Sequence, residues 1–252
     1  MVGALSRLCK PHAVHDAAYG KLARRFTTRD ESGLAFHPRT VIFDLDVTLT
    51  EYDTFLPFLF GYLRHYRKRR SLKLYRLPLN LLKFWHWGNR TWMKTEMLKA
   101  FMGGEPRQRI NGWVDQFVEE LMGDGMREQG LAELRAYQDQ GVRVILASAS
   151  FDIYVHAIAK RLGIDEVLAT RAAWDRRDRL AGMAGENCRD EEKLRRIKTL
   201  ADIPADGQGV AAYSDSHADL PLLGWAEHGV AVCPSKRLFH QVAGLGLEVA
   251  RW

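Results

Sequence analysis

The stretch Arg39-Thr-Val-Ile-Phe-Asp44-Leu-Asp46-Val-Thr48 decides the fold, because an apolar run of strand length ends in two carboxylates. A short, continuous apolar run is typical of a buried strand in a parallel sheet. In such sheets ligands bind beyond the carboxyl ends of the strands. We therefore expect Asp44 to stand at the rim of a sheet where a ligand can reach it.

Three further apolar runs of the same form follow along the chain, at residues 142–147, 209–213 and 229–232. The first of them ends at Ser148 and the second ends just before Asp215. Helical patterns separate the runs, at residues 129–140, 152–162 and 191–201. Strands that alternate with helices indicate an α/β fold with a doubly wound parallel sheet, so these polar residues should meet Asp44 at one rim.

Residues 55–129 interrupt the alternation and are mostly helical in pattern. They follow the loop of the first strand, so we expect a helical cap inserted there into a core formed by residues 38–54 and 130–252. Residues 1–37 are rich in Arg, Lys, His and Ala. A transit peptide, an amphipathic anchor and a disordered extension all fit that composition, and we take the extension as the expectation.

Composition excludes several classes of protein. Hydrophobic residues make up 46% of the 252 residues, enough to bury a sizeable core, so wholesale disorder is excluded. The three cysteines are far apart, which argues against a disulfide framework and leads us to expect a cytoplasmic protein. No stretch reaches the roughly 18 uncharged apolar residues that a membrane-spanning helix needs.

Positive charge is concentrated in one segment. The whole chain carries a net charge of +6, yet residues 55–104 contain eleven Lys or Arg and a single acid, Glu96. Aromatic residues are interleaved with these bases: Tyr62, Tyr66, Tyr75, Trp85, Trp87 and Trp92. This composition suits peripheral contact with an anionic membrane. The alternative is a cap whose aromatic residues pack internally and whose basic residues are solvated.

The carboxylate pair has the chemistry of phosphoryl transfer, which needs a nucleophile, a proton donor for the leaving oxygen and positive charge on the phosphate oxygens. Asp44 can attack phosphorus and form an aspartyl-phosphate. Asp46 can protonate the leaving oxygen and then activate the water that hydrolyses the intermediate. Two aspartates with one residue between them are weak evidence alone, and their place at the end of an apolar strand makes the case much stronger.

With these residues in view, the chain resembles the haloacid dehalogenase superfamily of phosphatases, in the phosphoserine phosphatase-like branch called subfamily IB. The resemblance covers about residues 38–252 and rests on four motifs in the family's order. The first, DxDxT, is matched by Asp44, Asp46 and Thr48, and the other three are matched by Ser148, by Lys193, and by the pair Asp215 and Asp219. The run from Tyr213 to Leu223 further resembles the branch of phosphatidylglycerophosphate and histidinol-phosphate phosphatases.

The resemblance implies a role for each matched residue. Thr48, Ser148 and the backbone amide of Ala149 would bind the substrate phosphate, at the start of the helix that follows. Lys193 would neutralise the nucleophile and the phosphate. The implied cofactor is Mg²⁺, with Asp219 holding a metal-bound water or orienting the lysine, and the metal set comprising Asp44, Asp46, Asp215 and Asp219.

Two positions depart from the family pattern or extend it. Val47 stands where relatives often carry Gly or Ser, and a β-branched residue there can alter the loop. Asp53 lies nine residues after the nucleophile, where phosphoserine phosphatases carry a Glu that contacts the substrate amine. A substrate contact and a helix N-cap before residue 55 explain Asp53 equally well.

The sequence leaves the substrate open between two classes. A lipid phosphate such as phosphatidylglycerophosphate would suit a basic, aromatic cap. A small soluble phosphate, such as phosphoserine or histidinol phosphate, suits the family pattern. A hypothesis of another class, a catalytically weak membrane-peripheral binding protein, is opposed by the complete motif set. No RNA-binding motif appears, so we expect no nucleic-acid partner.

Overall fold

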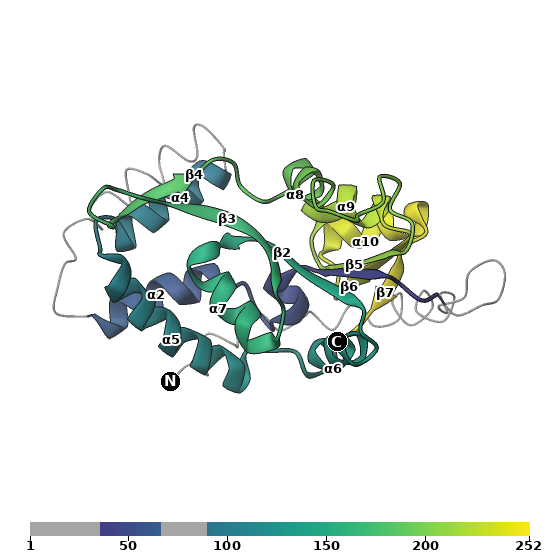
Figure 1. The fold of residues 1–252 in the computed structure, drawn as a ribbon, viewed down its shortest axis with the longest axis horizontal. Helices are drawn as coiled ribbons and strands as arrows, with labels where there is room; N and C mark the ends of the chain where they lie inside the picture. Colours follow the sequence, from purple (N-terminus) through teal and green to yellow (C-terminus); the bar gives the residue numbers. More distant parts are fainter. Residues whose placement is uncertain (1–35, 67–89) are drawn as a thin grey trace. The chain divides into compact units, whose positions relative to one another are not determined.

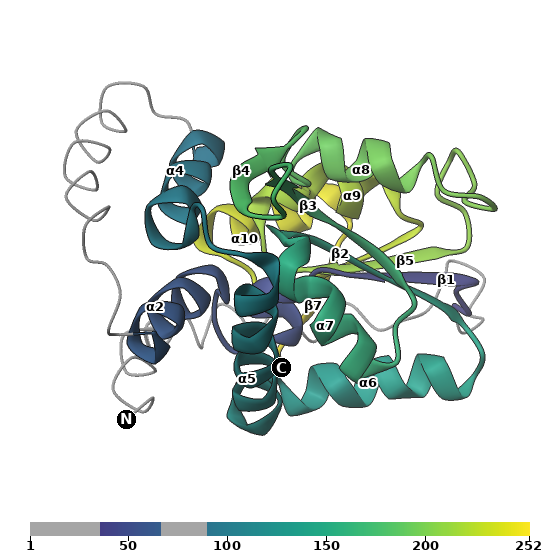
Figure 2. The ribbon, with the colours of Figure 1, turned by 60° about the vertical axis from the view of Figure 1, so that its left-hand side comes forward.

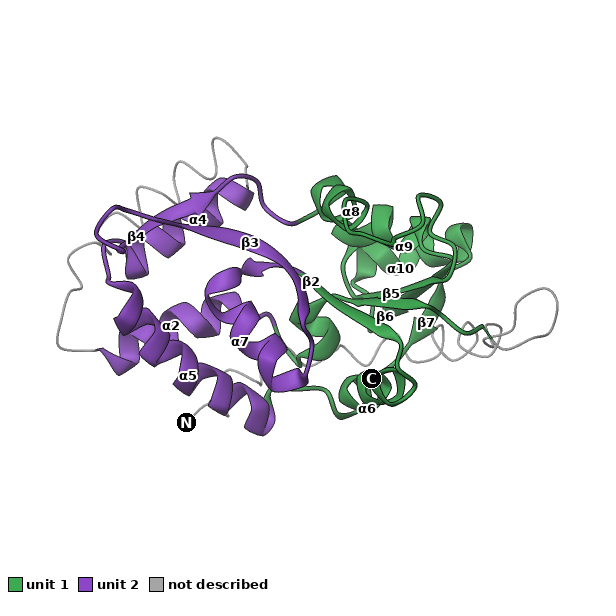
Figure 3. Cartoon of the chain, in the orientation of Figure 1, with its two compact units in different colours: residues 1–52, 125–147, 189–252 green, residues 53–124, 148–188 purple. Residues whose placement is uncertain are grey.

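The computed structural model describes residues 36–66 and 90–252. The extension up to residue 35 and the middle of the basic segment, residues 67–89, lie outside the described residues. The chain forms two compact units (Figure 3). The first unit comprises the residues up to Tyr52, residues 125–147 and residues 189–252, and the second comprises residues 53–124 and 148–188.

A seven-stranded sheet forms the framework, in the order β4-β3-β2-β1-β5-β6-β7. Its strands are β1 (Thr40–Phe43), β2 (Arg143–Phe151), β3 (Glu166–Trp174), β4 (Leu180–Ala184), β5 (Val210–Ser214), β6 (His228–Val232) and β7 (Glu248–Ala250). Strand β1 pairs in parallel with β2 and β5, β5 with β6, and β6 with β7, whereas β4 runs antiparallel to β3. The predicted doubly wound α/β fold is confirmed.

The register of the central strands explains why polar residues gather at one rim. Phe43 is level with Leu146 on β2 and with Tyr213 on β5. The backbone amide of Asp44 donates to the carbonyl oxygen of Tyr213 at 3.0 Å, so Asp44 and Ser214 leave the sheet side by side. The residues of β1 are all buried, as expected for a strand with neighbours on both edges.

Helices cover both faces of the sheet in the first unit. Figures 1 and 2 show α8 (Glu191–Ile197), α9 (Leu220–Trp225) and α10 (Lys236–Val242) on one side of β5 and β6, and α6 (Glu128–Asp139) on the other. Helix α8 is shorter than the predicted residues 191–201. The amides of Thr199 and Leu200 bond three residues back, which tightens the chain into turns after Ile197.

The second unit is built from helices around an aromatic core, together with the end of β2 and the pair β3–β4. Its helices are α2 (Phe55–His65), α4 (Arg90–Met102), α5 (Arg107–Asp124) and α7 (Asp152–Leu162). The indole nitrogen of Trp113 donates to the carbonyl oxygen of Phe58 at 3.0 Å. A Cβ atom added at Gly61 would collide with the Trp113 ring, so glycine there lets α2 and α5 approach closely.

None of the helices in residues 36–66 and 90–252 is long and apolar enough to cross a membrane.

Candidate active site

A buried lysine joins two carboxylates at the rim of the first unit. Lys193 lies in α8, and its Nζ is 3.0 Å from Oδ1 of Asp44 and 2.7 Å from Oδ2 of Asp219. The lysine is only 1% exposed. A charge buried this deeply is costly unless it is paired and hydrogen-bonded, so the three side chains form one electrostatic unit. In the sequence, Lys193 is 149 residues from Asp44 and 26 residues from Asp219.

Asp219 is held in place from its other side by Ser214. The Ser214 hydroxyl donates to Oδ2 of Asp219 at 2.6 Å, and both residues are buried. Asp219 ends the short turn η6 (His217–Asp219), which follows β5. Asp219 is therefore fixed between the Ser214 hydroxyl and Nζ of Lys193. Ser214 was not among the predicted site residues, although its position directly before Asp215 was a usable signal.

The two aspartates of the first motif lie on a tight turn after β1. The turn, η4 (Leu45–Leu49), has extended backbone at Asp46 and a left-handed backbone at Val47, with φ 61° and ψ −4°. This conformation costs a β-branched residue about 1–2 kcal/mol, so neighbouring contacts must maintain it. Thr48 is fully buried, and its Oγ1 accepts a hydrogen bond from the amide of Asp215 at 3.0 Å. That contact ties the first motif to the fourth.

The centre carries more negative charge than its lysine balances. Burial raises the pKa of the Asp44 carboxyl to about 7, against the lowering effect of the Lys193 ammonium. Burial raises the pKa of Asp215 to about 8, and the neighbouring carboxylates of Asp44, Asp219 and Asp46 add to the rise. A nucleophilic carboxylate must be ionised, so a further cation beside these carboxylates would favour the reactive form of Asp44.

The chemistry of these donors fits Mg²⁺. In the described parts of the chain, no group of three or more His, Cys, Asp or Glu side chains is arranged to hold a metal ion. Mg²⁺ does not require such a group, because it usually binds one or two carboxylates and completes its shell with water and substrate phosphate. The Asp44 carboxylate adds to the rise in the pKa of Asp215, and a cation placed beside these two hard oxygen donors would offset that repulsion.

Two of the predicted phosphate-binding residues, Ser148 and Ala149, lie in the second unit near the end of β2. Ser148 is fully buried, and its Oγ accepts a hydrogen bond from the amide of Ser150 at 2.9 Å. Two donors meet the carbonyl oxygen of Ala149: the hydroxyl of Thr170 at 2.6 Å and Nζ of Lys94 at 2.5 Å. These contacts fix the peptide that follows Ser148. Neither Thr170 nor Lys94 was predicted, and no local motif marks them.

Asp53 lies on the surface at the start of the second unit. Its Oδ1 accepts a hydrogen bond from the amide of Phe55 at 2.9 Å. This bond satisfies one of the open amides at the start of α2, which is the capping interaction considered from the sequence.

Fold and site together define the chain as an α/β enzyme whose centre combines several carboxylates with a buried lysine. The chain belongs to the haloacid dehalogenase-like hydrolases, because the model of that family matches residues 41–224. The matched range contains all four motifs. Protein CicA of Caulobacter vibrioides is 29% identical over 197 residues, which cover 77% of this chain and 86% of that protein.

Solved structures show the same fold at low sequence identity. A Bordetella pertussis Tohama I protein of unknown function has a TM-score of 0.72 at 22% identity, covering 85% of this chain and 98% of that one. A phospho-aspartyl intermediate analogue of phosphoserine phosphatase has a TM-score of 0.56 at 17% identity, covering 85% and 93%. These structures show the fold, and the family match over residues 41–224 confirms the predicted superfamily.

Proposed function

We propose that this hydrolase is a Mg²⁺-dependent phosphomonoesterase that works through an aspartyl-phosphate on Asp44. The observation that carries the proposal is the buried contact of Lys193 with Asp44 at 3.0 Å and with Asp219 at 2.7 Å. A fixed cation beside a buried carboxylate favours the ionised nucleophile and stabilises charge that develops on a transferred phosphoryl group. The structural likeness to a phospho-aspartyl analogue of phosphoserine phosphatase is consistent with this chemistry.

In the first step, an Oδ atom of Asp44 attacks phosphorus while the bond from phosphorus to the ester oxygen breaks. Asp46 gives its proton to the departing oxygen, so an alcohol leaves and the phosphoryl group remains on Asp44. Asp46 lies two residues after Asp44 on the turn that follows β1, and it is half-buried. From this position its carboxyl group can donate a proton to the leaving oxygen.

In the second step, the carboxylate of Asp46 takes a proton from water, and the water oxygen attacks phosphorus. The bond from phosphorus to Asp44 breaks, which releases inorganic phosphate and restores both aspartates. One group acts as acid in the first step and as base in the second, as the balance of protons requires. Lys193 stays charged throughout and keeps Asp44 oriented.

Mg²⁺ would be held by the side chains of Asp44 and Asp215 and by the backbone carbonyl of Asp46, with Asp219 acting through a bound water. When bound, the ion supplies positive charge that offsets the charge of the carboxylates and of the phosphate. Ser148, the amide of Ala149 and Thr48 are the proposed phosphate contacts. Asp53 keeps its proposed role toward a substrate amine, alongside its bond to the start of α2.

The substrate is proposed to be a phosphate monoester from one of two classes. The basic segment at residues 55–104 favours a lipid phosphate such as phosphatidylglycerophosphate, met by peripheral contact with an anionic membrane. Tyr62 instead favours a small soluble phosphate, because it is 3% exposed and packs on Tyr66, although Phe60 in the same segment is 53% exposed. Phosphoserine and histidinol phosphate represent the soluble class.

A panel of substrates separates these classes. We expect Mg²⁺-dependent phosphate release from at least one of four compounds: phosphatidylglycerophosphate in anionic vesicles, phosphoserine, histidinol phosphate and an aryl phosphate. Removal of Mg²⁺ with EDTA should abolish release, and added Mg²⁺ should restore it. Preference for the vesicle substrate would identify the basic segment as a docking surface.

The aryl phosphate serves as the control for a catalytically weak binding protein. It demands little of a specificity pocket, so a competent phosphatase should turn it over. A folded protein that binds anionic vesicles and hydrolyses none of the four compounds would contradict the proposal.

A further inference from the structure

The turn that carries Asp46 has a backbone conformation that its own sequence does not favour. Val47 has φ 61° and carries a branched side chain, whereas this region of backbone favours Gly, Asn and Asp. Such a residue persists only where surrounding contacts determine the conformation. Any movement at Val47 would displace the neighbouring carboxyl group of Asp46. The contacts that hold this turn are therefore relevant to proton transfer.

Thr50 and Arg127 both hold this turn: Thr50 Oγ1 accepts from the amide of Val47 at 3.1 Å, and Arg127 contacts the turn from a distant part of the sequence. Its Nε lies 3.2 Å from the carbonyl oxygen of Val47 and 3.2 Å from that of Thr50, and its backbone amide donates to Leu49 at 2.9 Å. Arg127 is only 8% exposed. Its planar guanidinium presents donors at fixed angles, so it can hold several carbonyl groups in one arrangement.

The other end of the guanidinium is anchored by Trp252. Nη1 of Arg127 donates to the backbone oxygen of Trp252 at 2.9 Å. The Trp252 ring stacks on Tyr213 with 5.5 Å between ring centroids, and Tyr213 precedes the Ser214-Asp215 end of β5. A Cβ atom at Gly130 would lie 3.0 Å from the Trp252 ring, so this glycine leaves the room that the indole occupies on α6.

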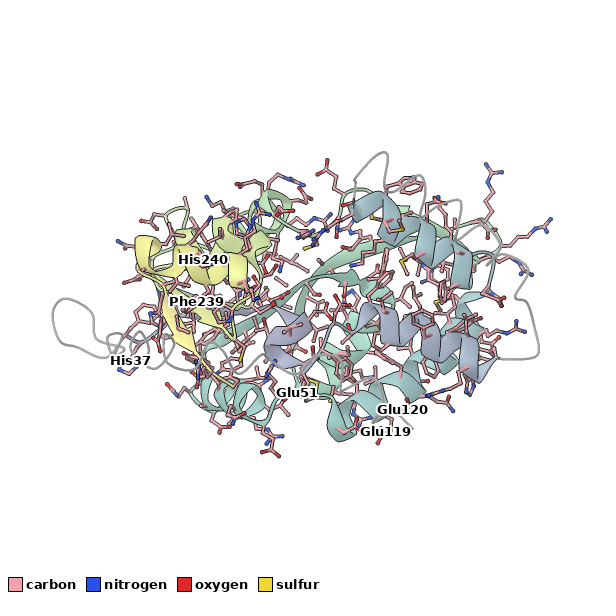
Figure 4. The ribbon with its side chains drawn as sticks, turned by 180° about the vertical axis from the view of Figure 1, so that it is seen from behind. His37, Glu51, Glu119, Glu120, Phe239 and His240 are labelled. Atoms are coloured by element: carbon pink, nitrogen blue, oxygen red, sulfur yellow. The ribbon has the colours of Figure 1, made fainter. Side chains whose placement is uncertain are left out.

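The ion pair of Arg127 does not account for its burial. Glu51 lies on the surface just after η4 (Figure 4), and its Oε2 is 3.3 Å from Nη1 of Arg127. The Glu51 side chain is 49% exposed, and ion pairs open to water contribute little. The carbonyl contacts are therefore the principal interactions of the guanidinium.

We propose that Arg127, anchored by Trp252, is a positioning residue that fixes the turn after the nucleophile and so aims Asp46 at the leaving oxygen. The proposal rests on the phosphatase function proposed above. The contacts of Arg127 with this turn are to backbone carbonyl groups, so its effect on catalysis is exerted through the backbone of the turn. It should therefore act on the steps that need Asp46.

The test compares leaving groups. An alkyl phosphate needs a proton from Asp46, whereas an aryl phosphate with an acidic phenol leaves readily without one. For Arg127→Lys we expect kcat on an alkyl phosphate to fall about 10- to 100-fold, which is below most of the 10²–10⁴ range of acid–base catalysis because Asp46 is displaced and not lost. With the aryl phosphate, kcat per folded protein should fall less than about 5-fold. KM should stay within about 2-fold of the wild-type value for both substrates. Trp252→Ala should show the same dependence on the leaving group, with a smaller fall in kcat.

Two controls separate positioning from general damage. Glu51→Gln removes only the exposed ion pair and should leave both activities unchanged. Arg143→Met removes another guanidinium contact, the bond to Ala201 O at 2.7 Å, from the far end of β2, and should not change the dependence on leaving group.

A double-mutant cycle tests the route through Asp46. Arg127→Lys should have almost no further effect on alkyl phosphate hydrolysis in an Asp46→Asn background, because the group that it positions is already absent. Equal losses on alkyl and aryl phosphates, or a full additional loss in the Asp46→Asn background, would overturn the proposal. Wild-type turnover in the same assays tests the phosphatase function separately.

Discussion

Replacing Asp44 with Asn is expected to reduce phosphate release by roughly 10⁴- to 10⁶-fold, the range seen when a hydrolase loses its nucleophile. The amide of Asn has the shape of the carboxylate but cannot displace the ester oxygen and form a mixed anhydride. Steady-state turnover of an aryl phosphate at saturating Mg²⁺ measures the effect. Loss of the first step should lower kcat with every substrate that the wild-type protein accepts.

The fold should survive this substitution, which makes the result interpretable. Burial raises the pKa of Asp44 in the folded protein to about 7. Because this pKa is higher in the folded than in the unfolded protein, ionisation of Asp44 lowers the free energy of unfolding once the pH rises above the unfolded pKa. The loss reaches its full size when the pH has passed the folded pKa. A neutral Asn avoids this loss, so Tm near neutral pH should hold or rise. Substantial activity in a folded Asp44→Asn protein, shown by mass to be free of deamidation, contradicts the assignment.

Replacing Lys193 with Met should affect both catalysis and stability. Loss of the ammonium should lower kcat by about 10²–10³-fold, the usual cost of one electrostatic contact in the transition state. It also leaves Asp44 and Asp219 buried without their cation, which we expect to lower the free energy of unfolding by about 3–5 kcal/mol. Urea denaturation and steady-state kinetics measure the two effects.

Lys198 provides the matched control for Lys193. It follows directly on α8, is exposed, and its Nζ lies 5.4 Å from the centre of the Trp225 ring. Lys198→Met should leave kcat and the free energy of unfolding nearly unchanged. If Lys193→Met retained wild-type kcat in its folded fraction, the lysine would not be part of the active site.

The sequence predicted the parts of the fold that local pattern determines. The apolar runs before Asp44, Ser148 and Asp215 correspond to β1, β2 and β5, because buried parallel strands read as continuous apolar segments. Strands β3 and β4 were not predicted. In β3, Thr170 and Arg171 interrupt the apolar residues, so no continuous apolar run marks the strand, and β4 is its antiparallel partner.

The site was predictable where a motif existed and not where contacts are long-range. Lys193 was found only through the order of the motifs, since a lysine in a charged helix is ordinarily a surface residue. Arg127 and Trp252 are 125 residues apart, and no spacing rule connects them. The left-handed backbone of Val47 could not be foreseen either, because β-branched residues disfavour it and part of what holds the turn is the distant Arg127.

The central claim, a phosphoryl group carried on Asp44, can be tested by trapping the intermediate. An Asp46→Asn variant should still be phosphorylated by an aryl phosphate, whose leaving group needs no proton, but should lack the base that hydrolyses the intermediate. After rapid acid quench, mass spectrometry of peptides should find the phosphoryl group on the peptide containing Asp44. Turnover of the aryl phosphate with no label on that peptide, or with the label on another residue, would contradict the mechanism.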